Sequence, residues 1–235
     1  MKAVILAAGR GTRMSNITED KPKCLINISG KTILERQIEI LLKYSIKQIY
    51  VVIGYKTEKI REKMRNIESI EMIENKEYAT TDNIYSLYLT LDKVKGEEFI
   101  LLNGDAVFEE EIIRRVVARK GLDIAPVDID YYDLEELKIR EKNGFVTEIL
   151  PKAASKKISN GSTIGVFKFS SEGSNALFYE IQSLIEKGAK NKWFEYALNN
   201  ILRKIKMYII NVSGLKWMEV DTLEDIKKSQ VLFGE

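Results

Sequence analysis

Short apolar runs alternate with helix-like segments along the first half of the chain, and this alternation restricts the possible folds more than any other feature. Residues 2–8, 48–53 and 99–102 are rich in small and branched apolar side chains, which is typical of strands buried on both faces. Apolar residues recur at three- and four-residue spacing over 33–42, which predicts an amphipathic helix. Strands and helices that alternate with short connections predict a parallel sheet covered by helices on both faces.

The pattern changes after about Leu122, where strand-like segments follow one another with fewer helices between them. In this part we expect strands at 137–139, 145–149, 164–169 and 207–211, and helices at 173–186, 193–203 and from Thr222. Only three prolines and no low-complexity tract could mark a linker. We therefore predict an α/β fold, in which residues 1–235 form a single doubly wound domain with a mixed, mainly parallel sheet.

The composition excludes several classes of function. The chain has no histidine, so a Ser-His-Asp triad, a histidine-ligated metal and a histidine general base are all impossible. A single cysteine, Cys24, excludes an internal disulfide framework. The 37 Lys and Arg nearly balance the 35 Asp and Glu, which argues against nucleic acid as a partner. Because no run approaches the ~18 apolar residues of a membrane span, and Met1 leads directly into a strand, we expect a cytoplasmic protein without a membrane partner.

The first predicted strand ends in a glycine-bearing loop that favours phosphate binding. Gly9 and Gly11 would let backbone N–H groups approach phosphate oxygens, and several basic side chains lie near them in the sequence. Met14 stands at the third glycine position of a dinucleotide-binding fingerprint, and a Walker lysine motif is absent, so neither of those sites is expected. The same residues also suit an ordinary tight turn beside a solvated basic face.

The segment Leu6–Met14 (LAAGRGTRM), followed by Pro22–Leu25 (PKCL), resembles the signature of nucleotidyltransferases that activate phosphorylated small molecules. The resemblance extends along the whole chain and implies the Rossmann-like nucleotidyltransferase fold. About 1–120 would then form the nucleotide-binding half and about 121–235 the acceptor-binding half. It implies that Arg13 and Lys23 act on the phosphates as catalytic residues. It also implies that the nucleotide is bound by Leu6, Ala7, Ala8, Gly9, Gly11 and Thr12.

Two aspartates follow predicted strands far apart in the sequence. Asp105 belongs to Asn103-Gly104-Asp105, which also suits a simple turn, and Asp221 stands where it could cap the last helix. Two carboxylates at strand ends near a polyphosphate loop are also what Mg²⁺ would use. The resemblance implies that Asp105 and Asp221 hold the Mg²⁺ cofactor, and that Asp105 also contacts the nucleotide.

The segment 80–89 (TTDNIYSLYL) looks like that of bacterial choline-phosphate cytidylyltransferases and their relatives, rather than that of sugar-1-phosphate enzymes. This resemblance implies CTP as the donor and a nucleotide or substrate contact for Asn83, whereas the tyrosines of the segment could simply pack in the core. The resemblance further implies that Lys152 meets the acceptor phosphate and that Trp193 and Glu195 line the acceptor pocket. Aromatic core packing and a helix-start acid would explain the last two equally well.

Together these residues predict an enzyme that transfers CMP from CTP to a phosphorylated acceptor such as phosphocholine or inositol-1-phosphate, with release of pyrophosphate. The acceptor phosphate is already an anion at neutral pH, so a chain without histidine can run this reaction. One alternative is a sugar-1-phosphate nucleotidyltransferase that uses UTP, dTTP or GTP. A second, of another class, is a non-catalytic nucleotide-binding regulatory subunit.

Overall fold

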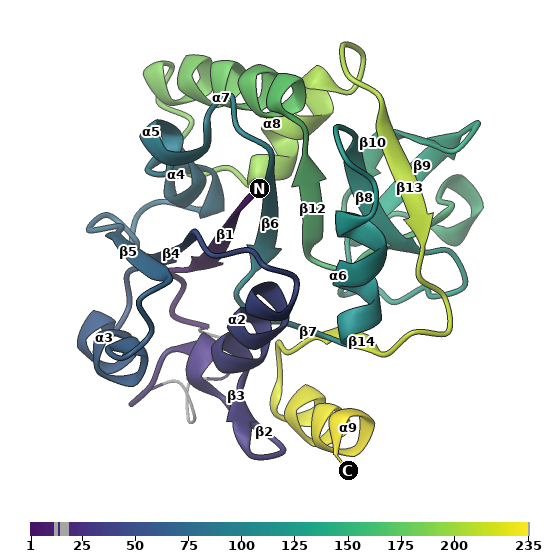
Figure 1. Ribbon diagram of the computed structural model, residues 1–235. Coiled ribbons are helices and arrows are strands. Elements are labelled where there is room, and N and C mark those ends of the chain that lie inside the picture. The colour runs from purple at the N-terminus through teal and green to yellow at the C-terminus, as the bar shows by residue number, and fades with distance from the viewer. Residues whose placement is uncertain (12–13, 15–18, 235) are drawn as a thin grey trace.

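The fold is described from a computed structural model, and the description covers residues 1–11, 14 and 19–234. One large sheet runs through the molecule in the order β11-β9-β10-β13-β8-β12-β6-β1-β4-β5 (Figure 1). Its amino-terminal part contains β1 (Lys2–Ala7), β4 (Ile49–Ile53), β5 (Ile70–Glu74) and β6 (Phe99–Asn103). Its carboxy-terminal part contains β8 (Asp123–Asp128), β9 (Lys138–Lys142), β10 (Phe145–Leu150), β11 (Gly161–Thr163), β12 (Val166–Phe169) and β13 (Met207–Asn211).

The two parts of the sheet differ in strand direction. β5, β4, β1 and β6 are all parallel, as the alternation of strands and helices predicts. In the carboxy-terminal part β13 is parallel to β8, but β12 is antiparallel to both β6 and β8, and β9, β10 and β11 pair antiparallel. The prediction of a mixed sheet is confirmed, but its mainly parallel character holds only for the amino-terminal part. A tight hairpin explains part of this, because Asn143 and Gly144 both have positive φ and reverse the chain between β9 and β10.

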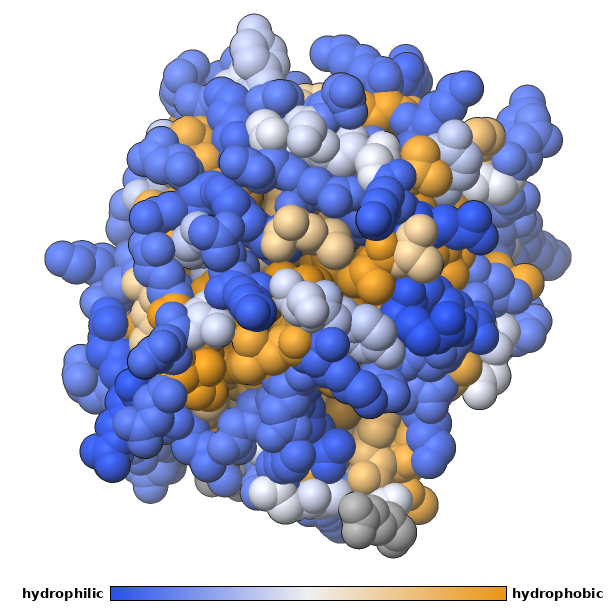
Figure 2. Space-filling view, in the orientation of Figure 1, coloured by the Kyte–Doolittle hydropathy of each residue, from blue (hydrophilic) through white to orange (hydrophobic). Residues whose placement is uncertain are grey.

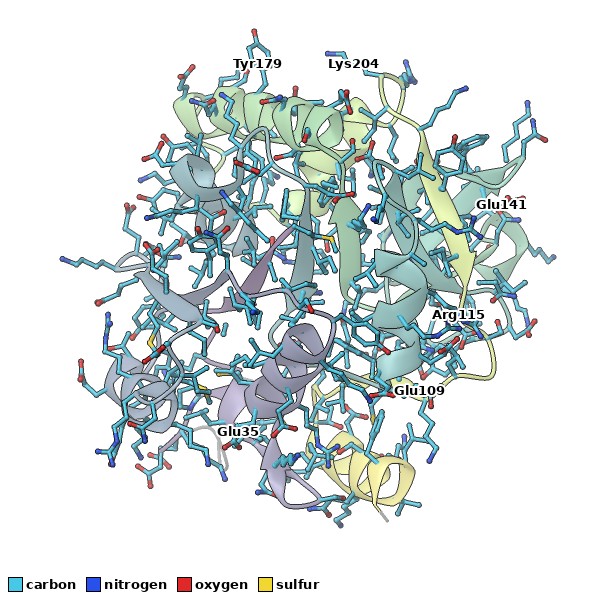
Figure 3. The ribbon with its side chains drawn as sticks, in the orientation of Figure 1. Glu35, Glu109, Arg115, Glu141, Tyr179 and Lys204 are labelled. Atoms are coloured by element: carbon cyan, nitrogen blue, oxygen red, sulfur yellow. The ribbon has the colours of Figure 1, made fainter. Side chains whose placement is uncertain are left out.

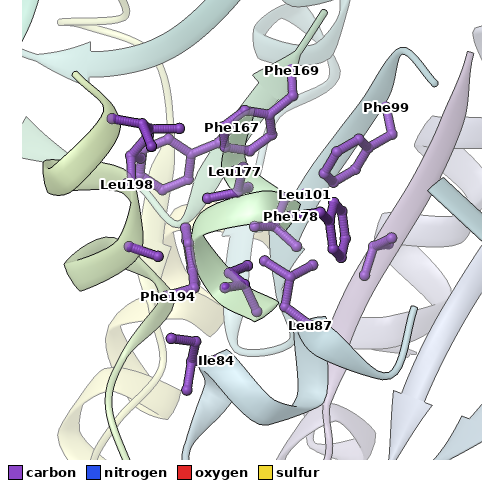
Figure 4. Packing of buried hydrophobic residues seen from close by; sticks show 14 of the residues in the cluster. Ile84, Leu87, Phe99, Leu101, Phe167, Phe169, Leu177, Phe178, Phe194 and Leu198 are labelled. Carbon is purple, nitrogen blue, oxygen red and sulfur yellow. The ribbon is translucent and has the colours of Figure 1, made fainter. Parts of the chain in front are cut away.

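Helices cover both faces of the sheet, so the doubly wound arrangement is confirmed. One face packs against α4 (Asn83–Tyr88), α5 (Leu91–Val94), α7 (Ser171–Glu186) and α8 (Phe194–Ile201). Figure 4 shows the aromatic centre of this cluster, where Phe99, Phe178 and Phe194 lie among aliphatic side chains. The other face packs against α2 (Ile33–Lys43), α3 (Thr57–Met64) and α6 (Glu110–Val117). Successive strand residues alternate between the faces, since Val4 belongs to the first cluster and Ala3 and Ile5 to the second.

Two small sheets and three short elements complete the fold. β2 (Asn27–Ile28) pairs with β3 (Lys31–Thr32), and β7 (Ala106–Phe108) pairs with β14 (Trp217–Glu219). The remaining elements are the 3₁₀ turns η2 (Lys23–Leu25) and η3 (Lys156–Ile158), and the last helix α9 (Leu223–Phe233), which lies beside β2 and β14 (Figure 1). The β7–β14 ribbon joins segments more than a hundred residues apart, and we did not predict it from the sequence.

Hydrophilic side chains dominate the face seen in Figure 2. Charged residues such as Glu141 and Lys204 project from the surface, and so does Tyr179 on α7 (Figure 3). Within the described part of the chain, no helix combines the length and the apolar character that a bilayer span needs.

Candidate active site

The candidate site lies where β1 and β6 end side by side. The loop after β1 begins at Ala8 and Gly9, and the turn Asn103-Gly104-Asp105 follows from β6. The Gly104 N–H donates to the carbonyl of Leu6 at 3.0 Å, which fixes the two loops against each other. A Cβ at Gly104 would lie 2.6 Å from that carbonyl oxygen, so this close approach requires glycine. Three adjoining pockets open around this point, and all three are lined by Asp105.

The first pocket has a volume of about 240 Å³ and brings together a lysine and two aspartates. The Lys23 Nζ lies 2.5 Å from Asp105 Oδ2 and also contacts Asp221 Oδ1. Burial lowers the pKa of Lys23, but the two aspartates raise it by more, to about 12, so the ammonium stays charged. The other lining residues are Leu6, Ala7, Gly9, Gly11, Cys24 and Gly104.

The second pocket has a volume of about 190 Å³ and a small polar lining at the start of α4. Asn75 is buried, and its Nδ2 donates to Thr81 Oγ1 and to Ser86 Oγ, each at 3.1 Å. Asn75 Oδ1 accepts from the Glu77 N–H at 2.9 Å, which fixes the orientation of the amide. This network holds Ser86 at the wall of a pocket that also includes Ala8, Gly9, Tyr78 and Asn83.

The third pocket has a volume of about 170 Å³ and is lined mainly by residues of the carboxy-terminal half. Lys152 Nζ lies 3.6 Å from Asp221 Oδ2. Glu195 is 5% exposed, and burial raises its pKa to about 8. Among the described residues, its Oε2 atom has no hydrogen-bond partner. A buried carboxyl oxygen without a partner is costly, so this atom is a candidate contact for a ligand or for water.

Two further buried acids were not predicted from the sequence: Glu219, which lines the third pocket, and Glu136, which contacts Glu219. Glu219 accepts a hydrogen bond from Asn103 Nδ2 at 3.0 Å, and burial raises its pKa. Glu136 hydrogen-bonds to Glu219, and burial together with that carboxylate raises the pKa of Glu136 to about 9. Glu219 could have been found from the sequence, because it stands two residues before Asp221 at the end of a strand. Glu136 gave no such signal.

Most of the residues predicted from the sequence line these pockets. The nucleotide residues Leu6, Ala7, Ala8, Gly9, Gly11 and Asp105 line the first two, and Lys152, Trp193 and Glu195 line the third together with Asp105 and Asp221. Thr12 and Arg13 lie outside the described residues, so their predicted roles remain predictions.

Asn83 lies between the second and third pockets and joins them. Its Oδ1 accepts from the Phe194 N–H at 2.7 Å, and its side chain also hydrogen-bonds to Glu195. The predicted contact of Asn83 with a ligand is therefore accompanied by a link to the start of α8, which the sequence did not reveal.

The structure settles two alternatives that the sequence left open. The cap of α9 is Thr222, whose Oγ1 accepts from the Asp225 N–H at 3.2 Å, so the alternative in which Asp221 caps this helix does not hold. The Asp221 side chain is instead directed to Lys23. Tyr85 and Tyr88 are half-buried rather than core residues, with stacked rings 6.0 Å apart. Ile84 and Leu87 form the buried face of α4.

The paired aspartates suit a hard divalent cation. Among the described residues, no group of three or more acids, cysteines or histidines could hold an ion by itself. Mg²⁺ is usually held by one or two carboxylates together with substrate phosphates and water. Asp105 and Asp221, which converge on one side of the first pocket, fit that requirement.

The ends of parallel strands β1 and β6 carry the glycine loop and Asp105, and Lys23 and Asp221 join them from η2 and from the end of β14, an arrangement typical of nucleotide-binding α/β domains. Residues 3–131 match the MobA-like NTP transferase domain, and the chain belongs to this family. It is 31% identical over 234 residues to the bifunctional IPC transferase and DIPP synthase of Thermococcus kodakarensis, a match that covers 97% of this chain and 50% of that protein. It is 25% identical over 251 residues to the CTP:phosphoglutamine cytidylyltransferase of Campylobacter jejuni, which covers 97% of this chain and 98% of that one.

The fold agrees with solved structures. The CTP:phosphocholine cytidylyltransferase of Streptococcus pneumoniae superposes with a TM-score of 0.81 at 21% identity, over 99% of this chain and 98% of that chain. The predicted nucleotidyltransferase fold is therefore confirmed. The chain spans about half the length of several curated relatives that it matches.

Proposed function

We propose that this chain transfers CMP from CTP to a phosphorylated small-molecule acceptor and releases pyrophosphate. The observation that carries the proposal is the convergence of Lys23, Asp105 and Asp221 at the point where the three pockets adjoin. In this arrangement the triphosphate would occupy the first pocket, the base the second and the acceptor the third. The α-phosphorus would then lie beside Asp105, between the leaving pyrophosphate and the attacking phosphate.

Catalysis by these residues would consist of positioning and charge neutralisation. Mg²⁺ held by Asp105 and Asp221 would neutralise the negative charge of the phosphates in the transition state. The glycine loop would direct backbone N–H groups at the triphosphate, and Lys23 would supply a charged donor. Lys152 would hold the acceptor phosphate in line with the bond that breaks. No residue has to remove a proton, because the attacking phosphate oxygen is already ionised.

The second pocket supports a pyrimidine donor. Its polar wall, which includes Ser86, is fixed by the Asn75 network. Since Ser86 Oγ accepts a hydrogen bond from Asn75, its own proton can be directed at a carbonyl or ring nitrogen of the base. Two similar proteins are a CTP:phosphoglutamine and a CTP:phosphocholine cytidylyltransferase, and their use of CTP supports cytosine as that base.

The third pocket supports an acceptor that carries a hydrogen-bond donor or a positive charge near its phosphate. Glu195 offers a buried oxygen to such a group, and the Trp193 ring lines the same pocket. A quaternary ammonium, as in phosphocholine, would be attracted to both. The hydroxyl groups of inositol-1-phosphate would donate to the same carboxyl.

Sugar-1-phosphates are a second candidate class of acceptor, with UTP, dTTP or GTP as the donor. One observation favours them, namely that the third pocket is bordered by the carboxyl groups of Glu195 and Glu219, which also suit sugar hydroxyls.

A matrix of substrates tests the proposal. CTP, UTP, dTTP and GTP are each combined with phosphocholine, inositol-1-phosphate and glucose-1-phosphate, and pyrophosphate release is measured with Mg²⁺ and with EDTA. We expect Mg²⁺-dependent release with CTP and with one of the first two acceptors. The same result from the Asp221→Asn variant would contradict the assigned site. Nucleotide binding without pyrophosphate release from any pair would instead support a non-catalytic subunit.

A further inference from the structure

Lys23 occupies the space between the two aspartates that would hold the metal. Its Nζ lies 2.5 Å from Asp105 Oδ2 and also contacts Asp221 Oδ1. The side chain of Lys23 is 12% exposed, that of Asp105 26% and that of Asp221 9%, so water screens this cluster only partly. A second ammonium, that of Lys152, lies 3.6 Å from Asp221 Oδ2.

The two ammonium groups neutralise much of the negative charge that would attract a metal ion. Within the described residues Lys23 contacts both aspartates and Lys152 lies near Asp221, while the buried Glu219 carboxyl, whose pKa burial raises, also faces these groups. A divalent cation added here would meet two positive charges in a partly buried site. The metal would also compete with Lys23 for the same carboxylate oxygens. A triphosphate changes this balance, because its negative charges can accept both the metal and the lysine.

The backbone at Lys23 is fixed, whereas its side chain has room to move. Pro22 precedes it, the Leu25 N–H donates to the Pro22 carbonyl at 2.9 Å, and Cys24 is buried. The first pocket continues from the Lys23 ammonium to Gly9 and Gly11, where the phosphates are expected. A rotation of the flexible lysine stem would therefore carry the charge from the aspartates to the triphosphate without a shift of η2.

We propose that Lys23 is an internal counterion that pairs the two aspartates in the ligand-free protein and yields them to Mg²⁺ only when a triphosphate arrives. The inference rests on the proposed function, since it assigns a second role to the same lysine. It follows that the metal alone binds weakly, that metal and nucleotide bind cooperatively, and that removal of the lysine charge strengthens binding of the metal alone.

Binding of Mn²⁺ without nucleotide tests this exchange, because Mn²⁺ is paramagnetic and its free fraction can be measured by electron paramagnetic resonance. The Lys23→Met variant keeps an unbranched, flexible side chain that is one atom shorter and removes its charge, and we expect it to bind Mn²⁺ about tenfold or more tightly than the unaltered protein. Lys31→Met is the matched control, since Lys31 pairs with Glu39 on the surface and should leave Mn²⁺ affinity unchanged. Adding Asp221→Asn to Lys23→Met should abolish the gain.

A charge-conserving variant and a comparison with turnover complete the test. Lys23→Arg keeps the charge and should bind Mn²⁺ as weakly as the unaltered protein. A thermal transition shows whether Lys23→Met is folded. If the folded variant binds Mn²⁺ no more tightly than the unaltered protein, the exchange is overturned. If Lys23→Met does not fold, Lys23→Gln replaces it in the same measurement. These measurements need no turnover. If Lys23→Met leaves the Mn²⁺ affinity unchanged while the unaltered protein releases pyrophosphate, the exchange alone is rejected. If Lys23→Met binds Mn²⁺ more tightly while the unaltered protein releases no pyrophosphate from any substrate pair, only the proposed reaction is rejected.

Discussion

The proposed nucleotide side, which comprises the first two pockets, and the proposed acceptor side, which is the third pocket, are built by different means. Besides the charged groups around Asp105, the first two pockets are walled by backbone and small side chains, such as Ala8, Gly9 and Gly104, next to the parallel strands β1 and β6. The third pocket is walled mainly by polar, charged and aromatic side chains, with Glu195 and Lys152 among them. On the proposed assignment, the backbone would contact what all nucleoside triphosphates share, whereas these side chains would distinguish one acceptor from another. We therefore expect acceptor choice to change by single substitutions while the nucleotide side stays the same.

The largest effect is expected where the two sides meet. Asp105→Asn removes one of the two converging carboxylates, and we expect turnover to fall by about 10³ for every donor and acceptor, because charge neutralisation at the phosphates is lost. Pyrophosphate release measures it, with the exposed Asp130→Asn as the control. A variant that lost activity with only one acceptor would show that Asp105 belongs to the acceptor side.

The next largest effect is expected from a methyl group added to the glycine loop, which should change the KM for CTP but not that for the acceptor. No described atom lies within 4 Å of a Cβ built on Gly9, so Gly9→Ala should fold normally while its methyl group obstructs the triphosphate. We expect the KM for CTP to rise on the order of 10- to 100-fold with an unchanged acceptor KM. Gly104→Ala should also lower the melting temperature, because its Cβ would lie 2.6 Å from the Leu6 carbonyl oxygen. Equal melting temperatures for the two variants would contradict this distinction.

Charge removal should affect only the acceptor side. At about pH 9, where the Glu195 carboxyl is ionised, Glu195→Gln keeps the shape of the side chain but removes the negative charge, and we expect the acceptor KM to rise about tenfold with little change in the KM for CTP. Steady-state kinetics with each substrate varied in turn measures this. A matched rise in both values would mean that the Asn83–Glu195 contact couples the pockets more tightly than their separate linings suggest.

The smallest effect is a dependence on pH. Burial raises the pKa of Glu195 to about 8, so in the free protein this carboxyl is protonated below that pH and ionised above it. For a cationic acceptor the KM should therefore fall by a few-fold as the pH rises from about 7 to about 9. Glu195→Gln should flatten this change, and a neutral acceptor should not show it. A fall that persists in the variant would assign the titration to another group.

The raised pKa of Glu195 also predicts how the stability of the folded protein depends on pH. The folded protein holds the Glu195 proton between pH 4.5, the ordinary value, and about 8, whereas the unfolded chain has released it. The contribution of this group to stability is therefore complete below pH 4.5 and decreases as the pH rises to about 8. Chemical denaturation of Glu195→Gln across this range should show a smaller loss of stability.

The nucleotide side could be predicted from the sequence because its signals are local. A buried strand that ends in Gly9-x-Gly11, and another that ends in Asn103-Gly104-Asp105, place both loops at the same edge of a parallel sheet. The Thr32 cap of α2 also follows from neighbouring residues, since Glu35 completes its capping box.

The acceptor side was predicted less completely because its contacts join distant segments. The pairing of Glu136 with Glu219 and the hydrogen bond from Phe194 to Asn83 leave no periodic trace in the sequence. Strand direction in the carboxy-terminal part depends on hairpins and on the crossover to β13, which apolar runs do not encode. The sequence left a cap at Asp221 open because aspartate and threonine both serve as caps, whereas the structure has Thr222 in this position.

The β7–β14 ribbon determines when the site can exist during synthesis. The Val220 N–H donates to the Asp105 carbonyl at 3.0 Å, so β14, which follows every strand of the large sheet in the sequence, brings Asp221 to Asp105. A nascent chain that has not reached β14 would carry Asp105 without its partner in the proposed metal-binding pair. We therefore expect a fragment that ends before this strand to lack turnover.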